Sequence, residues 1–326
     1  MLAFTLRRIA ISIPVLLISS FVVFVLASAA GDPLDPLLAR NPPPPPQTIA
    51  NETERLRLDD PLLSRYWQWL TGIFQGDFGP SVNPARVIGD EIGDRFLVTL
   101  RLIALAMIVA LVLAVVVGVV SAVKQYSLVD YGATFFGFLF LSMPAFWLAI
   151  LLKQAGIEFN LAVGDSVIYT IGEATPNFQG SFGERLADIA GHMVLPTISL
   201  ALISYAAWSR YQRASMLEVM NSDYIRLARA KGLPQRTVTV RHGLRNALIP
   251  LTTVTALDLA SIISGAVVTE RVFQWRGMGD FLLNAIATDD VYATMAWLLV
   301  TATVVILFNL IADLLYAVLD PRIRYA

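Results

Sequence analysis

Two acidic side chains interrupt the apolar stretches of this chain and are the first candidates for chemistry. Asp258 lies near the middle of one stretch, and Asp313 lies near the end of the last one, four residues after Asn309. A carboxylate in hydrocarbon costs at least about 2.5 to 3.5 kcal/mol, so each acid should face protein or water. Asp258 could line a path for a cationic group together with the hydroxyls of Thr255 and Ser261. Alternatively, hydrogen bonds to those hydroxyls would make Asp258 a structural residue.

Other reactive groups are few, which excludes several kinds of catalytic site. The chain has no Cys and only two His, so it has no thiolate nucleophile and no all-His metal cage. It contains neither the H-E-x-x-H motif of metalloproteases nor a G-x-x-x-x-G-K-[ST] nucleotide loop. We therefore expect no catalytic residue, no metal site and no cofactor on this chain. A proton-coupled transporter that uses Asp258 and Asp313 is an alternative.

The composition indicates a membrane protein. Of the 326 residues, 56% are hydrophobic and 15% are charged, and the mean hydropathy is +0.64, far from the averages of soluble proteins. Lipid offers no hydrogen bonds to backbone amides, so helices of about 20 residues are the expected form. The sequence predicts an all-α protein with six transmembrane helices, at residues 9–30, 102–123, 131–152, 189–208, 247–269 and 291–318.

The Lys and Arg content of the loops predicts their sides of the membrane. Residues 209–247 hold eight basic residues and two acidic ones, whereas residues 31–95 hold ten acidic and six basic residues. The positive-inside rule then places loop 209–247 and both termini in the cytoplasm. Arg7 and Arg8 before the first apolar run also resemble the start of a signal peptide. The run is longer than the roughly 7 to 15 residues of a signal-peptide core, so we expect it to be a retained transmembrane helix.

Three regions follow from these spans: residues 1–30, an outer segment 31–95, and a five-span core 96–326. In the outer segment, the prolines of Asn41 to Gln47 favour an extended polyproline II spacer. A short helix is predicted after it, with Asp60 as N-cap and Pro61 at its first position. We expect this helix to cap the bundle or lie on the outer leaflet, and ligand recognition is the alternative. Its apolar side chains fall on one stripe: Leu63, Tyr66, Trp67, Leu70 and Phe74.

Within loop 209–247, residues 222–233 predict another short helix. Ser222 or Asp223 suits the N-cap, and Gly232 suits the left-handed position that ends a helix. Pro234 suits the first position of a second helix that leads to the fifth span. Spacings of three and four residues put four side chains on a common face of this helix: Tyr224, Leu227, Ala228 and Lys231. The small side chain of Ala228 would allow the backbone of a partner protein to approach. Alternatively, the loop is only solvated and its charges serve to set the topology. The neighbouring membrane spans argue against reading its basic residues as a nucleic-acid-binding patch.

The stretch "DYIRLARAKGLPQRTVTVRHGLRNALIP" resembles the EAA-type loop of binding-protein-dependent ABC importer permeases, in the form found in the oligopeptide/dipeptide/nickel family. The resemblance, which favours the OppB/DppB-type branch, continues in "GDFGPSVNPARVIGDEI", "SMPAFWLAILL", "HMVLPTISLAL", "VVTERVFQWRGMG" and "LDPRIR". Ala228 and Gly232 match the broad EAA pattern, but Arg226 and Leu227 stand at its first two positions. Arg276 stands where the family usually has Pro.

The resemblance implies a type I ABC importer permease in a bacterial inner membrane. Such a subunit forms half of a channel in a heterodimer with a second permease of the family, and an extracytoplasmic binding protein delivers the substrate. ATP and Mg would bind to separate cytosolic ATPase subunits. Peptides are the expected substrate, with nickel or glutathione as alternatives. The residues implied to contact the ATPase are Asp223, Tyr224, Arg226, Leu227, Ala228, Arg229, Lys231 and Gly232.

Overall fold

The computed structural model describes residues 2–319, and every regular element in this range is a helix. Side chains are described for the same residues apart from 2–5, 36, 257, 259–261, 263–265 and 312–319. The predicted roles of Ser261 and Asp313 therefore lie outside the described residues. The chain divides into two compact units. The divisions fall within two long helices, after Thr99 and Leu310, and in the connection between two helices, after Trp275.

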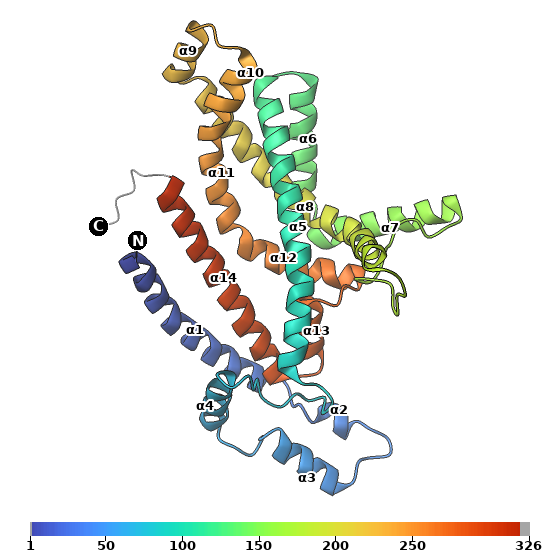
Figure 1. Cartoon of the computed structure of the whole chain (residues 1–326). Helices are drawn as coiled ribbons and strands as arrows, with labels where there is room; N and C mark the ends of the chain where they lie inside the picture. The colour runs from blue at the N-terminus through green and yellow to red at the C-terminus, as the bar shows by residue number, and fades with distance from the viewer. Residues whose placement is uncertain (1, 320–326) are drawn as a thin grey trace. The chain divides into compact units, whose positions relative to one another are not determined.

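Unit 1 consists of residues 1–99 and 276–310. Its elements are α1 (Leu2–Ala30), α2 (Asp35–Leu38), α3 (Pro46–Arg55), α4 (Leu62–Ile73), the start of α5 (Ile88–Val123), α13 (Met278–Ala287) and most of α14 (Val291–Leu319). Large buried side chains from four of these helices form its core: Phe24, Tyr66, Trp69, Phe281 and Met295. This core attaches α4 and α13 to the long helices α1 and α14 (Figure 1).

Unit 2 consists of residues 100–275 and 311–319 of the described chain. After the rest of α5 it contains α6 (Leu128–Ser142), α7 (Ala145–Val163), α8 (Phe182–Met220), α9 (Asp223–Ala230), α10 (Gln235–Thr237), the π-helix η1 (Val238–Leu244), α11 (Arg245–Leu257) and α12 (Leu259–Phe273). Helix α8 is central, because it packs against α6, α7, α11 and α12. Gly118 permits a close approach of α5, since a Cβ there would lie 2.7 Å from Cβ of Gln212 on α8.

Four of the six predicted spans lie within single long helices. The predicted residues 9–30, 102–123, 189–208 and 291–318 fall in α1, α5, α8 and α14. By length and composition, five helices of the described chain could cross a membrane: Leu6–Ala30, Ile88–Val123, Ala145–Val163, Phe182–Met220 and Val291–Ile311. Pro14 and Pro196 are accommodated inside α1 and α8.

The other two predicted spans differ from a single helix. The third is broken into two helices, so its prediction is wrong, whereas the fifth is interrupted only at Asp258. The third run breaks at Met143, whose ψ of 130° is extended. Pro144 causes this break, because proline lacks an N–H and disfavours helical geometry in the preceding residue. The fifth run divides at Asp258 into α11 and α12. Hydrogen bonds of the α-helical pattern continue through the division, from Asp258 N to Val254 O and from Ile262 N to Asp258 O.

The outer segment also differs from its prediction in detail. Pro46 and Gln47 begin helix α3, so the extended spacer is shorter than the proline tract. Pro61 is the N-cap of α4 and not its first residue. The predicted stripe on α4 is divided between two environments, because Tyr66 is buried whereas Leu63 and Trp67 are exposed. Trp69, outside that stripe, is buried as well.

Candidate functional site

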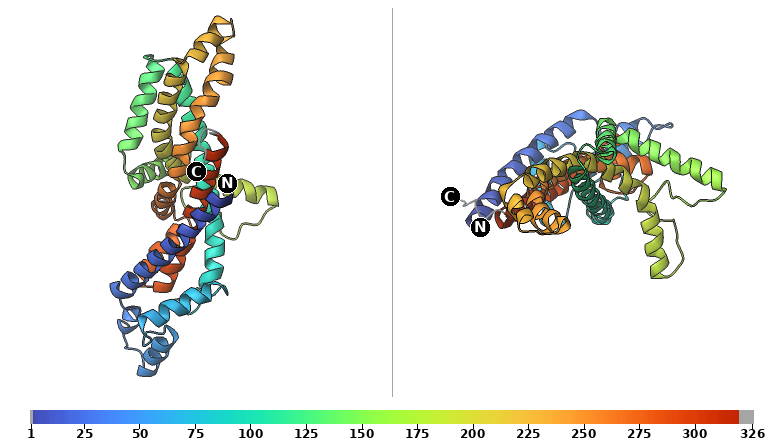
Figure 2. Two further views of the ribbon diagram at one scale, coloured as in Figure 1. Left: turned by 90° about the vertical axis from the view of Figure 1, so that its left-hand side faces the viewer. Right: turned by 90° about the horizontal axis from the view of Figure 1, so that it is seen from above.

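Helix α9 lies at the tip of unit 2, between the end of α8 and the start of α10 (Figures 1 and 2). Ser222 is its N-cap residue, although the hydroxyl donates to Val219 O and not to the helix. Gly232 has φ of 76°, as predicted, and its N–H donates to Arg229 O. Leu233 N also donates to Ala228 O, which completes a Schellman motif. The sequence prediction of this short helix and of its glycine end is confirmed.

The inner face of α9 forms a small core of its own with the segment that follows. Ile225, Ala228 and Val238 are buried together, with Val219 and Met220 at the end of α8 packed against them. Ala228 is only 7% exposed, so most of its surface is already covered within this chain. Its small size serves packing inside the loop. Ile225, which the sequence analysis missed, could have been found from its spacing of three residues to Ala228.

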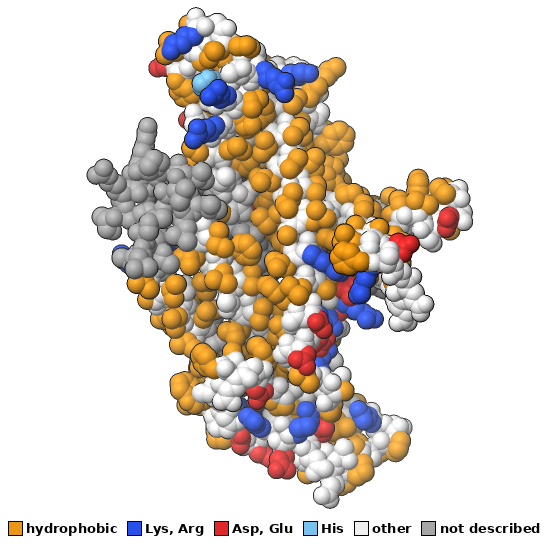
Figure 3. Space-filling view, in the orientation of Figure 1, with side chains coloured by type: hydrophobic (Ala, Val, Ile, Leu, Met, Phe, Trp, Pro, Cys, Tyr) orange, Lys and Arg blue, Asp and Glu red, His pale blue; other side chains and the backbone are white. Residues whose placement is uncertain are grey.

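The outer face of α9 carries the remaining predicted residues. Tyr224 is 43% exposed and Leu227 is 57% exposed. The basic residues Arg229 and Lys231 are also exposed, and Arg226 forms an ion pair with Asp223. Figure 3 shows Lys and Arg side chains gathered at this end of unit 2. The face therefore combines two exposed apolar side chains with positive charge, a combination that suits contact with a protein surface of acidic character.

The segment after α9 connects this helix to α11 without a flexible break. Pro234 is the N-cap of α10, one position earlier than predicted, and the π-helix η1 continues into α11. Gly243 packs on α8, since a Cβ there would meet Met216 Cε at 2.9 Å. Asn246 Nδ2 on α11 donates to the hydroxyl of Tyr224 at 3.0 Å. Helix α9 is therefore held by both α8 and α11.

A buried ion pair fastens the turn between α5 and α6 to α8, in the part of α8 that follows its predicted span. Asp130 is 2% exposed and accepts hydrogen bonds from Arg213 Nε at 2.7 Å and Nη2 at 2.8 Å. The same carboxylate accepts from the hydroxyl of Ser121 and from Tyr126 N. Bidentate pairs of this kind fix orientation as well as distance. We name these four residues the α5–α6–α8 clamp; the sequence analysis missed it because its members are 92 residues apart at most in the chain.

Asp258 has a hydrogen-bond partner other than the predicted ones. Its Oδ2 accepts from Nε1 of Trp208 on α8 at 2.7 Å, and Trp208 is fully buried. The hydroxyl of Thr255 donates to the carbonyls of Leu251 and Thr252, within its own helix. The structure thus joins Asp258 to α8 and does not bring Thr255 to its carboxylate.

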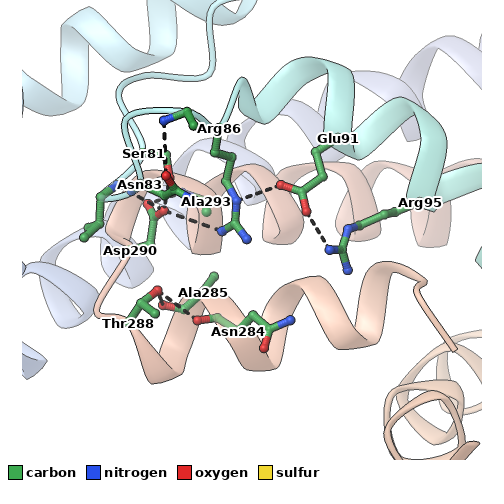
Figure 4. Close-up of polar contacts among 12 residues, drawn as sticks. Ser81, Asn83, Arg86, Glu91, Arg95, Asn284, Ala285, Thr288, Asp290 and Ala293 are labelled. Atoms are coloured by element: carbon green, nitrogen blue, oxygen red, sulfur yellow. Dashed lines mark hydrogen bonds and ion pairs between the residues drawn. The ribbon is translucent and has the colours of Figure 1, made fainter. Parts of the chain in front are cut away.

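Unit 1 contains a chain of alternating charges that the sequence analysis also missed (Figure 4). Arg86 pairs with Glu91 at 2.7 Å, and Glu91 pairs in turn with Arg95 at 2.6 Å. Both arginines also contact acidic residues near α13: Arg86 lies 3.8 Å from Asp290, and Arg95 lies 2.9 Å from Asp280. These pairs connect the start of α5 to α13 and to the turn that precedes α14. They hold the outer segment in place and lie far in sequence from α9.

Comparisons with known proteins agree with this architecture. Residues 114–325 match the family of binding-protein-dependent transport system inner membrane components, and residues 1–102 match the N-terminal family of such membrane components. The oligopeptide transport system permease protein OppB of Mycobacterium tuberculosis (strain ATCC 25618 / H37Rv) is 40% identical over 318 residues, 98% of each chain. AppB of Bacillus subtilis (strain 168), also an oligopeptide permease, is 38% identical over the whole of both chains. The dipeptide permease DppB of Escherichia coli (strain K12) is 36% identical over all of this chain and 99% of its own.

Among solved structures, the inward-facing MetNI methionine ABC transporter has a similar fold. A chain of that transporter aligns with a TM-score of 0.53 and 16% identity, over 70% of this chain and 96% of its own. This supports the predicted architecture of a type I ABC importer permease. On the strength of the family match over most of its length, the chain belongs to the binding-protein-dependent transport system inner membrane components.

Proposed function

We propose that this permease imports peptides. Its curated relatives at 36% to 40% identity carry oligopeptides or dipeptides according to their names, and the match extends over essentially the full length of each. The chain would form half of a translocation channel with a second permease of the family. A binding protein outside the membrane would deliver the peptide, and separate cytosolic subunits would hydrolyse ATP with Mg. Both termini and α9 would then lie in the cytoplasm, as the positive-inside rule predicts.

The outer face of α9 is the proposed contact with the ATPase subunits. The observation that carries this proposal is the division of the helix into two faces. Ile225 and Ala228 are buried in the loop's own core, which leaves Tyr224 and Leu227 exposed. An apolar pair surrounded by positive charge is what a partner cleft with an acidic rim requires.

Movement of such a partner would pass directly into the membrane helices. The core of α9 includes residues at the end of α8 and at the start of η1, and the bond from Asn246 to Tyr224 adds a link to α11. Helix α8 packs in turn on α6, α7, α11 and α12. Because packed helices transmit displacement as rigid bodies, a shift of α9 would move several helices of unit 2 together.

The test places a charge on the outer face and compares it with a matched position. Leu227→Asp would bury an unpaired carboxylate in the contact, at a cost of about 2 kcal/mol or more, which is roughly thirtyfold in affinity. Val240 on η1 has a similar exposure, 53% against 57%, and lies outside α9, so Val240→Asp is the control. We expect Leu227→Asp to lose ATPase subunits during purification and to lose ATP-driven import, with normal amounts in the membrane. Equal retention of the ATPase subunits by both variants would contradict the coupling role.

Substrate class needs a separate measurement, because α9 carries no information on it. Proteoliposomes that contain the permease pair, the ATPase subunits and the binding protein should take up a labelled oligopeptide only when ATP is present. Uptake of nickel complexes or glutathione with no uptake of peptides would refute the peptide proposal and leave the importer assignment unchanged.

Asp258 and Thr255 are proposed to lie on the translocation path, with the Asp258 carboxylate held by Trp208. The change Asp258→Asn keeps an oxygen that can accept the indole hydrogen bond but removes the charge. If the charge contacts the amino end of a peptide, import should slow while complex assembly is unchanged. Normal import of peptides with a free amino terminus would leave Asp258 as the structural partner of Trp208 alone.

A further inference from the structure

Helix α4 presents two different apolar surfaces. Tyr66 and Trp69 are buried in the core of unit 1. Leu63, Trp67 and Phe74 are 65%, 62% and 88% exposed. At 3.6 residues per turn these three fall within one narrow sector, beside the buried sector and distinct from it. An exposed apolar stripe of large side chains on a helix that is already packed requires an apolar environment on its second side.

The third sector of α4 is polar and borders a hollow in the surface. Gln68, Thr71 and Gln75 are exposed on this side. They line a hollow of about 630 Å³ with residues of the α3 end and of the turn that follows it, several of them acidic, among them Glu54 and Asp60. The polar sector therefore faces water. A helix with a polar side and an apolar side of this width is typical of segments that lie in a membrane interface.

Contacts with α1 fix how deep α4 lies. The hydroxyl of Tyr66 is 2.9 Å from Oγ of Ser20 and donates to Leu17 O at 3.2 Å. The ring also packs against Phe24. Ser20 lies about 15 Å from the end of α1 at Ala30, at 1.5 Å per residue, whereas the hydrocarbon core is about 30 Å thick. The contacts therefore place α4 beside the membrane-spanning part of α1 and not beyond its end.

The lipid-facing surface of α1 continues onto α4 at this depth. Ile18, Val22 and Leu26 on α1 are 65%, 48% and 62% exposed, as a face of a membrane span that contacts acyl chains would be. Figure 3 shows hydrophobic side chains covering the α1 side of unit 1 down to α4, with charged side chains gathered further on, toward α3.

We propose that α4 is embedded in the bilayer leaflet at the Ala30 end of α1, with Leu63, Trp67 and Phe74 in contact with acyl chains. The helix thereby anchors the segment between α1 and α5 to the membrane. The occupant of this face is lipid and not a second protein, since the face is continuous with the lipid-exposed side of a span. This inference is independent of the substrate and of the coupling role of α9.

Spin labels on single cysteines test the proposal, because the natural chain has no Cys. Labels would be placed at Leu63, Trp67 and Phe74, with Gln68 and Thr71 on the same helix as matched controls. The full chain, assembled with its partner subunits in phosphatidylcholine and phosphatidylglycerol nanodiscs, would be measured for collisions with oxygen and with a water-soluble nickel chelate. We expect a several-fold higher ratio of oxygen to nickel collisions at the three apolar positions than at the two controls.

Two outcomes would overturn the proposal. Frequent nickel collisions at Trp67 and Phe74 would show that the face is in water, and rare collisions with both reagents would show that a protein covers it.

A second measurement avoids the labels altogether. Brominated lipids should quench part of the native tryptophan fluorescence, and the conservative change Trp67→Phe should remove the most strongly quenched component. Identical fractional quenching in the native chain and in Trp67→Phe would refute lipid contact.

Discussion

The α5–α6–α8 clamp predicts a large effect from a single substitution far from α9. Arg213→Met keeps most of the length of the side chain but removes the guanidinium, so Asp130 loses its two bonds from Arg213. The carboxylate side chain is 3% exposed and retains only Ser121 and Tyr126 N as partners. A buried charge without its counter-ion is the circumstance in which breaking an ion pair is most destabilising.

The size of the effect follows from burial. Removing one partner of a buried pair costs about 3 to 5 kcal/mol. The Arg213 side chain is 28% exposed, so water already reaches one side of the pair and the lower value, about 3 kcal/mol, is expected. For a unit of this size each kcal/mol lowers the melting temperature by roughly 2 to 4 °C. Arg213→Met should therefore melt roughly 6 to 12 °C below the native chain.

Two further variants make the test specific. Arg210→Met, one turn away on α8, removes a guanidinium that lies 4.5 Å above the ring of Phe138, which is worth about 0.5 to 1 kcal/mol at an exposed site. The double variant Asp130→Asn with Arg213→Met removes the unpaired charge, while the Asn oxygen can still accept from Ser121. It should be more stable than Arg213→Met although it carries one substitution more.

The measurement is the fraction of protein that remains monodisperse in detergent after heating to a series of temperatures. The reasoning would be refuted if Arg213→Met melted no lower than Arg210→Met. It would also be refuted if the double variant were less stable than the single one, because burial of an unpaired charge would then not be the cause.

Three further predictions concern backbone geometry and topology. Gly232→Ala should lower the free energy of unfolding by about 1 to 2 kcal/mol, because alanine is strained in the left-handed backbone. No steric term is expected, since no atom lies within 4 Å of the added Cβ. An unchanged melting temperature would contradict the strained φ. Gly118→Ala should lower the free energy of unfolding by about 1 to 3 kcal/mol, because it overpacks α5 against α8. Gly93→Ala on the same helix, with open space around it, should leave stability unchanged or raise it. Equal effects of the two substitutions would refute the close approach. In otherwise intact cells whose outer membrane alone is permeabilised, a cysteine at Thr48 should react with an impermeant thiol reagent added outside. A cysteine at Thr237 should react only after lysis, and the reverse pattern would overturn the proposed orientation.

The positions of the long helices could be predicted because they depend only on local composition. Runs of about 20 apolar residues have one stable form in lipid, so four of the six appeared as expected. The two divided runs show what composition omits. In the third run, a single residue, Pro144, decides whether one helix becomes two. The division at Asp258 accompanies a bond to Trp208, 50 residues away, and apolar periodicity carries no information on that bond.

The loop helix was predicted from its caps, but the burial of Ala228 inside the loop was not. The left-handed geometry of Gly232 is a local property of the backbone and is readable from sequence. The direction in which α9 turns its faces depends on Val219 and Val238, which come from other elements. The same limit applies to α4, where Tyr66 was expected to share a surface with Leu63, while the structure separates the two by packing one of them against α1. Long-range ion pairs such as Asp130 with Arg213 have no periodic signature at all.

The π-helix η1 makes the length of this loop critical. A turn of π-helix holds more residues than a turn of α-helix, and such segments commonly mark a functional site. Deleting one residue from Val238–Leu244 should let the segment rewind as an α-helix. Each residue turns an α-helix by about 100°, so the deletion would swing Leu227 and the rest of the outer face of α9 around the axis of α11. Exposed positions on this loop should therefore accept substitutions far better than insertions or deletions, and loops should be exchangeable between related permeases only as blocks of equal length.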